Sequence, residues 1–454
     1  MRVNNVTFKA GGEAGTGIAT IGTLFSKLMQ RSGLYVFSTN DYPSLIRGGH
    51  NTITVRASDQ KVYALHEPAD ILVALDKLTI AIHAPDLAPG AAIIYDSTRI
   101  KEADVRLSGR TDLRLFPVPL SKIAIDAGGE LFFNQVAIGA TLGLLGMDLS
   151  LLKTLIEKMF GRKGAAVVAQ NAQAAQGGFD HVKETLASKP FDVHIQPRPP
   201  PAKMMLIAGN DAVCTGAIAS GLKLVAEYPM SPSSSVLHWM AAHAVKHQVV
   251  VKHTEDEIAA MNWICGAGFA GVRTLTATSG GGFALMAEAL GNAGIAEIPA
   301  VIIEDMRCGP STGLPTYTEQ ADLRFALHAS QGEFPRIVAM PGDPEECFYM
   351  TFDVFNMADA VQTPAIILLD KYLAESAVTI PTLQTASLKI NRGALQTDAQ
   401  MEKALPSGTP GGFKRHELTP SGVSPRCIPS QKNGIHVCSS YEHDETGFSS
   451  EEAH

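Results

Sequence analysis

The sequence predicts an α/β protein made of two such domains in series. Short apolar runs alternate with longer amphipathic stretches, which is the pattern of strands and helices in parallel βα units. The pattern stops at a proline-rich stretch, residues 189–203, and then starts again. Apolar residues make up 45% of the 454 residues, which is enough to form two packed cores.

The first domain is predicted over residues 1–188. An apolar run followed by an amphipathic one gives a strand and a helix, joined by the glycine-rich turn Gly11–Gly17. Such a turn lets backbone amides approach a phosphate at a helix N-terminus, but it lacks the full dinucleotide-binding pattern. A tight turn without a ligand therefore stays open as the alternative. The predicted strands are Val3–Ala10, Thr52–Arg56, Ile71–Leu75 and Ala92–Tyr95, and the predicted helices are Gly15–Arg31, Leu131–Leu145 and Leu149–Phe160.

The stretch Lys189–Lys203 contains five prolines, which predict an extended interdomain linker. A surface loop within one domain is the alternative. A second α/β domain is predicted over residues 204–385, and residues 386–454 read as an irregular segment. The predicted strands of the second domain are Met204–Ala208, Val249–Lys252, Arg273–Ala277, Ala300–Glu304, Arg336–Met340 and Ala365–Leu369, and the predicted helices are Ala212–Ala226, Glu257–Gly271, Phe283–Ala293 and Pro344–Met357.

Charge and cysteine usage exclude several classes of function. With 37 Lys and Arg against 45 Asp and Glu, the net charge is −8, which argues against a nucleic-acid or anionic-membrane surface. No apolar run reaches the roughly 20 residues of a membrane span, and the N-terminus does not resemble a signal peptide. The six cysteines are scattered without a CxxC pair. The sequence therefore predicts a reduced, cytoplasmic chain without a zinc site or an iron–sulfur cluster of its own.

Two polar stretches of the second domain are candidates for chemistry. The acidic run Thr254–Glu257 precedes a helix, where the helix dipole favours negative charge. Glu257 leads directly into apolar residues, so we expect its carboxyl group to be half buried, where it could share a proton. In Tyr228–Ser234, two prolines fix the backbone around Ser231, while Ser233 or Ser234 could cap the following helix.

Two loops at predicted strand ends suit ligand binding. Thr276–Phe283 combines a strand end, a glycine turn and a helix start, so a flat ligand could approach its backbone closely. Asp305–Thr316 follows a predicted strand at the C-terminal edge of the sheet, where such folds bind ligands. Its guanidinium, on Arg307, suits a carboxylate, and pairing with Asp305 or Glu304 to brace the loop is the structural alternative. The polar elbow Arg47–Asn51 reads equally well as a pocket, a subunit contact or a turn.

Several long segments resemble one enzyme family. YPMSPSS, TEDEIAAMNWICGAGFAGVRTLTATSGGGFALMAEALG and EDMRCGPSTGLPTYTEQADL, in that order, resemble the α chain of 2-oxoacid:ferredoxin oxidoreductases. GGEAGTG and STNDYPSLIRGGHN are similar to the γ domain of the same enzymes. The resemblance implies a Rossmann-like γ domain fused to a parallel α/β domain that receives the aminopyrimidine ring of thiamine diphosphate.

The resemblance also implies a division of labour between subunits. A β subunit would supply Mg²⁺, the diphosphate site and a [4Fe-4S] cluster, ferredoxin would take the electrons, and coenzyme A the acyl group. In this chain, Glu257 matches the glutamate that hydrogen-bonds the pyrimidine ring. Ser231, Arg307 and Thr316 match residues that meet the 2-oxoacid. The cofactor-binding residues implied are Tyr228, Pro229, Glu257, Ser279 and Gly280, and no metal ligand is predicted in this chain.

The expected function is the fused γα subunit of a cytoplasmic heterodimer that oxidatively decarboxylates a 2-oxoacid, with 2-oxoglutarate as the preferred substrate. The alternatives are a branched-chain or broad 2-oxoacid enzyme, or a truncated assembly module without catalysis. The sequence departs from the family at TSGGG, where the family has TSGPG, and at Gln331, which replaces a histidine. Relatives also continue beyond the position that corresponds to His454, so a C-terminal domain is expected to be missing or the chain to be a fragment.

Overall fold

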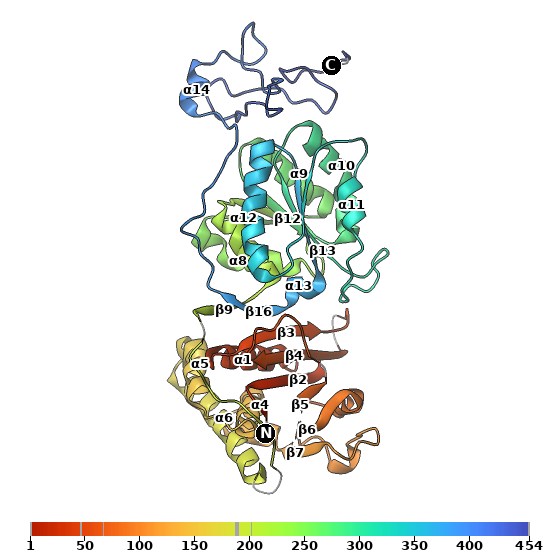
Figure 1. Ribbon diagram of the computed structural model, residues 1–454, viewed down its shortest axis with the longest axis vertical. Coiled ribbons are helices and arrows are strands. Elements are labelled where there is room, and N and C mark those ends of the chain that lie inside the picture. The colour runs from red at the N-terminus through yellow and green to blue at the C-terminus, as the bar shows by residue number, and fades with distance from the viewer. Residues whose placement is uncertain (1, 46–47, 67, 187–189, 201, 453–454) are drawn as a thin grey trace. The chain divides into compact units, whose positions relative to one another are not determined.

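The computed structural model describes residues 2–45, 48–66, 68–186, 190–200 and 202–452 (Figure 1). The chain divides into two compact units. The first comprises Met1–Ile207 and Ser376–Thr382, and the second comprises Ala208–Glu375 and Leu383–His454. Each unit is built around its own sheet, which is what the alternating pattern predicts.

The first unit contains an eight-stranded mixed sheet in the order β7-β6-β5-β2-β4-β3-β16-β9. Strands β2, β5, β6 and β7 are parallel, whereas β4 runs antiparallel to both β2 and β3. The chain passes from β2 through α1 to β3, and β2 and β3 are not neighbours in the sheet. Strand β4 follows β3 in the sequence and lies between β2 and β3. The strands are β2 (Asn5–Glu13), β3 (Tyr35–Asp41), β4 (His50–Ser58), β5 (Ala69–Ala74), β6 (Leu87–Asp96), β7 (Arg114–Val118), β9 (Met204–Ala208) and β16 (Ala377–Pro381).

Helices cover both faces of this sheet. The larger core joins one face to α1, α4, α5 and α6, and includes the stacked rings of Phe8 and Phe25. The smaller core joins the other face of β5 and β6 to α2 and to the short helix η1. The helices are α1 (Ile18–Arg31), α2 (Lys77–His83), α3 (Leu120–Asp126), α4 (Phe133–Leu144), α5 (Ser150–Phe160) and α6 (Ala165–Leu186), with 3-10 turns η1 (Ala84–Asp86), η2 (Glu102–Asp104), η3 (Glu130–Phe132) and η4 (Gly161–Lys163).

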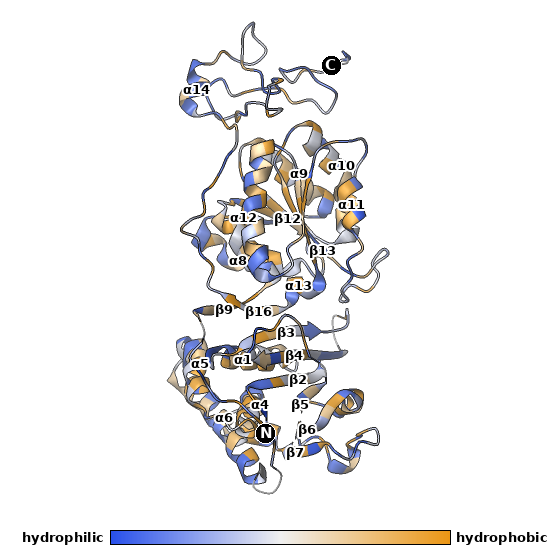
Figure 2. Cartoon of the chain, viewed as in Figure 1, coloured by the Kyte–Doolittle hydropathy of each residue, from blue (hydrophilic) through white to orange (hydrophobic). Residues whose placement is uncertain are grey.

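The second unit contains a six-stranded sheet in the order β11-β10-β12-β13-β15-β14, and all its pairings are parallel. This confirms the predicted parallel α/β domain. Figure 2 shows the apolar colour concentrated in the central strands, as expected for a sheet covered on both faces. The strands are β10 (Leu224–Glu227), β11 (Val250–His253), β12 (Thr274–Thr278), β13 (Val301–Met306), β14 (Ile337–Ala339) and β15 (Ala365–Asp370).

Helices α9, α10 and α11 pack into the core on one face of this sheet. On α7, Gly216 lies directly against the Phe348 carbonyl of α12, so a larger residue would force these helices apart. The helices are α7 (Gly209–Ala219), α8 (Ser234–His247), α9 (Glu257–Phe269), α10 (Gly280–Ile295), α11 (Leu323–His328), α12 (Pro344–Val361) and α13 (Lys371–Glu375).

The structure corrects the predicted helix Ala212–Ala226. Helix α7 ends at Ala219, and the last residues of the predicted helix form β10 instead. Gly221, with φ of 90°, adopts the left-handed conformation that ends a helix, and an apolar run this short suits a buried strand equally well.

The structure also corrects the predicted extent of the second domain, residues 204–385. Strands β9 and β16 belong to the sheet of the first unit, where β16 runs antiparallel to β3. The Val36 amide also donates to Thr379 Oγ1 at 3.0 Å, so β16 covers an edge of β3 that would otherwise be open. Within the predicted linker, β8 (Val193–His194) pairs with β1 (Arg2–Val3), while Lys189 lies outside the described residues.

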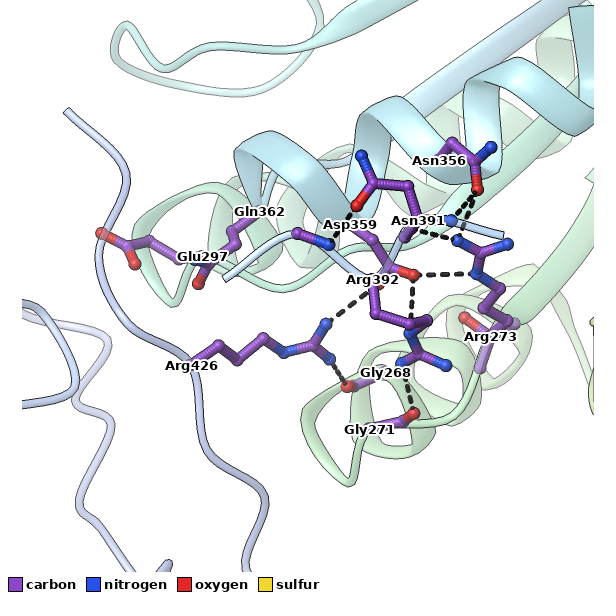
Figure 3. Close-up of polar contacts among 12 residues, drawn as sticks. Gly268, Gly271, Arg273, Glu297, Asn356, Asp359, Gln362, Asn391, Arg392 and Arg426 are labelled. Atoms are coloured by element: carbon purple, nitrogen blue, oxygen red, sulfur yellow. Dashed lines mark hydrogen bonds and ion pairs between the residues drawn. The ribbon is translucent and has the colours of Figure 1, made fainter. Parts of the chain in front are cut away.

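The segment after β16 is irregular apart from α14 (Asp398–Lys403). An arginine cluster joins this segment to α12, within the same second unit (Figure 3). Asp359 of α12 accepts ion pairs from Arg273, Arg392 and Arg426 at 2.8, 2.9 and 3.0 Å. None of the helices in the described ranges is long and apolar enough to cross a bilayer.

Candidate active site

A cleft of about 770 Å³ opens at the C-terminal edge of the second sheet. Parallel α/β folds bind ligands at this edge, because the loops that follow the strands meet there. Three segments line the cleft: the loop before α8, the start of α10 and the loop after β13. Their lining residues are Met230, Gly280, Gly281, Ala284, Arg307, Gly309, Pro310, Ser311, Thr312, Glu319, Ala321 and Asp322.

The acidic run before α9 separates into three roles. Asp256 caps the helix by accepting from the Ala259 amide at 2.7 Å. Glu255 is exposed and lies 3.9 Å from Lys252. Glu257 begins α9 and is 3% exposed, so it is buried more fully than its predicted half-buried position. Its Oε1 atom has no hydrogen-bond partner among the described residues.

Glycine at position 282 makes room for the Glu257 carboxyl group. A Cβ atom added there would lie 2.6 Å from Glu257 Oε1, closer than van der Waals contact allows. Ser279, which precedes α10, is also fully buried, and its Oγ has no partner among the described residues. The start of α9, with Glu257 Oε1, and the start of α10, with Ser279 Oγ, therefore present two buried polar atoms that a ligand could satisfy.

Arg307 lies in the cleft and touches the loop that carries Ser231. Its Nη1 donates to the Ser231 carbonyl at 2.6 Å. Partial burial lowers the pKa of Arg307, and the nearby Glu257 carboxylate partly offsets this. Within the described ranges, no carboxylate lies within ion-pair distance of Arg307. The bracing alternative, a salt bridge to Asp305 or Glu304, is therefore wrong.

The remaining predicted residues lie at different depths. Tyr228 is 37% exposed, with its ring centroid 6.2 Å from that of His253. Pro229 follows it, half buried. Ser233 does not cap α8 with its side chain, because its hydroxyl donates to the Met230 carbonyl at 2.7 Å. Thr316 is buried and is not among the lining residues of the cleft.

Sequence reasoning missed Asp322, a carboxylate in the wall of the cleft beside Gly280. It also missed Glu304, which is fully buried within β13. Burial raises the pKa of Glu304 to about 9, and the nearby negative charges of Asp322 and Asp305 raise it further. The available signal was an acidic residue inside a predicted buried strand, which is costly unless the group is protonated.

The first unit has a smaller cleft of about 370 Å³ beside its glycine-rich turn. Gly15 and Gly17 line it, both with positive φ, together with Asp96, Ser121 and Asn134. The elbow predicted at Arg47–Asn51 is only partly visible, because Arg47 lies outside the described residues. His50, at the start of β4, contacts His83 with 2.8 Å between their Nε2 atoms.

Two family models match the chain. Residues 7–181 match the pyruvate ferredoxin/flavodoxin oxidoreductase model, and residues 215–453 match the thiamine-diphosphate-binding model of pyruvate flavodoxin/ferredoxin oxidoreductases. A 2-oxoacid:ferredoxin oxidoreductase α subunit from Aeropyrum pernix is 31% identical over 99% of this chain and 76% of its own length. An α subunit from a Sulfolobus species is 32% identical over 97% of this chain and 75% of its own length. This chain belongs to the 2-oxoacid:ferredoxin oxidoreductase family, as an α subunit.

The solved structure of a relative has the same fold as this chain. The 2-oxoglutarate:ferredoxin oxidoreductase of Magnetococcus marinus, with 2-oxoglutarate, coenzyme A and succinyl-CoA bound, is 33% identical and superposes with a TM-score of 0.86. The match covers 99% of this chain and 76% of that one. The resemblance inferred from the motifs and the fused γα architecture are thereby confirmed.

The second unit of this oxidoreductase is a domain of the thiamine-diphosphate-binding type. Its residues fit an aminopyrimidine ring. Among the described residues, the Glu257 Oε1 atom is a buried acceptor without a partner, and Gly281, in the first turn of α10, borders open space. A flat ring with hydrogen-bonding nitrogens suits such a site better than an ion does.

Proposed function

We propose that this α subunit provides the pyrimidine half of a thiamine diphosphate site and binds 2-oxoglutarate for coenzyme A-dependent oxidative decarboxylation. The proposal rests on the Glu257 Oε1 atom, which is buried and has no hydrogen-bond partner among the described residues. Because residue 282 is a glycine, no Cβ atom displaces this oxygen from its position. A buried acceptor without a partner is costly, so its retention at the edge of a cleft is most simply explained by a bound donor.

The chain's own residues would share the work of binding and orientation. Thiamine diphosphate, when bound, supplies a nucleophilic carbon for the 2-oxo group and takes up the electron pair left as carbon dioxide departs. Glu257 Oε1 would hold a pyrimidine nitrogen and the proton exchanged with it. Ser279 and Gly280 would contact one side of the ring, and Tyr228 with Pro229 the other.

The 2-oxoacid would lie across the loops that follow β10 and β13. Ser231 and Arg307 are joined by the 2.6 Å hydrogen bond between Arg307 Nη1 and the Ser231 carbonyl, which leaves the rest of the guanidinium for a substrate carboxylate. Thr316 would support the loop.

The same proposal includes the other components of the enzyme. A β subunit would carry Mg²⁺, the diphosphate site and a [4Fe-4S] cluster, ferredoxin would accept the electrons, and the complex would work in the cytoplasm. The names of the relatives, α subunits of ferredoxin oxidoreductases, support this division. The coenzyme A and 2-oxoglutarate bound to the Magnetococcus marinus enzyme support the choice of substrates.

Co-expression with a β subunit of the same enzyme, followed by viologen reduction over a panel of 2-oxoacids with coenzyme A, tests the proposal. We expect coenzyme A-dependent reduction with 2-oxoglutarate as the preferred substrate. Preference for a branched-chain acid or equal use of several would favour the broad-specificity alternative. A stable complex without turnover on any 2-oxoacid would favour the assembly module and contradict the proposal.

A further inference from the structure

The loop that carries Ser231 is attached to the fold from two sides. On one side, Arg307 Nη1 donates to the Ser231 carbonyl at 2.6 Å. On the other side, Asn210 of α7 donates through Nδ2 to Ser235 Oγ, in the first turn of α8 that follows the loop, at 2.9 Å and, at a longer 3.4 Å, to the Pro232 carbonyl within the loop. The attachments lie before and after Pro232, so together they set where the Ser231 side chain sits.

Asn210 is itself held by a carboxyl group from the sheet. Asp305 Oδ2 accepts from Asn210 Nδ2 at 2.7 Å, the shortest of the three contacts that this nitrogen makes. Asn210 is 1% exposed and Asp305 is 0% exposed, so water cannot replace either partner. Asp305 and Arg307 lie two residues apart at the end of β13, so one strand end fixes both sides of the Ser231 loop.

The surroundings of Asp305 make this contact its main stabilising interaction. Its other oxygen, Oδ1, has no hydrogen-bond partner, and none of the described cations lies within ion-pair distance of it. Glu227 of β10, also fully buried, and Glu375 and Asp370 contribute negative charge nearby. A buried carboxyl group kept among other acids costs stability, which is more typical of a functional position than of a purely structural one.

We infer that Asn210 and Asp305 are positioning residues that hold the Ser231 loop in its substrate-binding conformation. They touch neither substrate nor cofactor, and act only through the backbone at Pro232 and the hydroxyl of Ser235. The inference rests on the proposed role of Ser231.

A double-mutant cycle in the reconstituted αβ complex tests the coupling. Asn210→Ala should lower kcat/KM for 2-oxoglutarate roughly tenfold, as expected for losing one buried hydrogen-bonded contact. Asp305→Leu should act in the same direction. Asp305→Asn, which keeps an acceptor for Asn210, should stay within about twofold of wild type. In a Ser231→Ala background, Asn210→Ala should cost little more, because the side chain that it positions is already absent.

Hydrogen exchange of the purified α subunit gives a second readout that does not need turnover. Exchange across residues 228–236 should be faster in Asn210→Ala and unchanged in Asp305→Asn. Ser220→Ala is the matched control, because it removes a buried hydroxyl at the other end of α7. Among the described residues, the Ser220 hydroxyl donates only to the Ala217 carbonyl.

Equal losses from Asn210→Ala with and without Ser231, or unchanged exchange over 228–236, would overturn the inference. Failure of the proposed function would look different. The wild-type complex would then turn over no 2-oxoacid, while the exchange experiment would still report whether Asn210 holds the loop.

Discussion

Two sets of buried carboxyl groups in the second unit have opposite surroundings. Asp359, 2% exposed, is surrounded by cations, because Arg273, Arg392 and Arg426 all reach it within 3.0 Å (Figure 3). Glu227, Glu304 and Asp305 are each 0% exposed at the C-terminal edge of the sheet, and no described cation lies within ion-pair distance of them.

The two settings serve different ends. The arginines around Asp359 also donate to the Ser220, Gly268, Gly271 and Asn391 carbonyls, so the cluster joins helix ends to the C-terminal segment. One carboxylate and several backbone carbonyls together accept from the three guanidinium groups, and these contacts join separate segments of the chain. At the sheet edge, burial raises the pKa of Asp305 to about 7 and that of Glu304 to about 9. Burying these carboxyl groups lowers the stability of the fold, and they lie at the edge of the sheet where α/β folds bind ligands.

The largest effect is expected from removing Asp359. Asp359→Ala leaves three arginines without their shared partner, and breaking a buried ion pair typically costs about 3–5 kcal/mol. At roughly 2–4 °C per kcal/mol for a unit of this size, the melting temperature should fall by about 6–20 °C. Calorimetry of the variant checks this, with Asp353→Ala on the exposed side of α12 as the control. Equal melting temperatures for the two variants would show that the arginines need no anion.

The next effect concerns substrate binding by Arg307. Arg307→Met should weaken 2-oxoglutarate by about 10- to 150-fold, because it removes a charged hydrogen-bonding fork. If Arg307 binds the distal carboxylate, pyruvate should suffer much less. If it binds the carboxylate that all 2-oxoacids share, both substrates should fall together. Steady-state constants decide between these outcomes, with Arg324→Met on exposed α11 as the matched control. Unchanged constants for both acids would remove Arg307 from the binding site.

A third effect is a change in the pH dependence of stability. The pKa of Asp305, about 7, lies above the value of about 3.9 expected in the unfolded chain. The folded protein therefore keeps a proton that the unfolded chain has already lost. Stability is greatest below pH 4 on this account and is lost as pH rises toward 7.

Asp305→Asn cannot ionise, so it should melt higher than wild type at pH 8, and the difference should shrink as pH falls and close near pH 4. Melting curves from pH 4 to 9 check this difference. Glu304→Gln is the companion variant, and its advantage should keep growing toward pH 9. Parallel curves for the variants and wild type would mean that both carboxyl groups titrate normally.

The sequence predicted much of this architecture because its signals are local. The apolar runs at β12, β13 and β15 and the helix start at Glu257 follow from patterns within a few residues. The pairing of β16 with β3 could not be predicted, since it joins residues more than 300 positions apart. The same holds for the contacts among Asn210, Asp305 and Pro232, which come from α7, β13 and the loop before α8.

Within the candidate site, the roles of Glu257 and Arg307 stay predictions from their motifs. Arg307 lines the cleft, and Glu257 lies buried against Gly282, next in the chain to the lining residues Gly280 and Gly281. Asp322 was missed because nothing near it in the sequence shows that it approaches Gly280, 42 residues earlier. The motif of Thr316 implied substrate contact, which stays a prediction, and in the structure Thr316 is buried and is not among the residues that line the cleft.

The turnover of a Glu257→Gln complex tests the central claim most directly. Glutamine keeps the volume of the side chain, so the variant should assemble with the β subunit and melt as wild type does. It cannot hold the exchangeable proton at Oε1, so 2-oxoglutarate-dependent viologen reduction should fall at least about 100-fold. Glu255→Gln, two residues earlier and exposed, should keep full activity. Near-normal turnover by the Glu257→Gln complex would contradict the account.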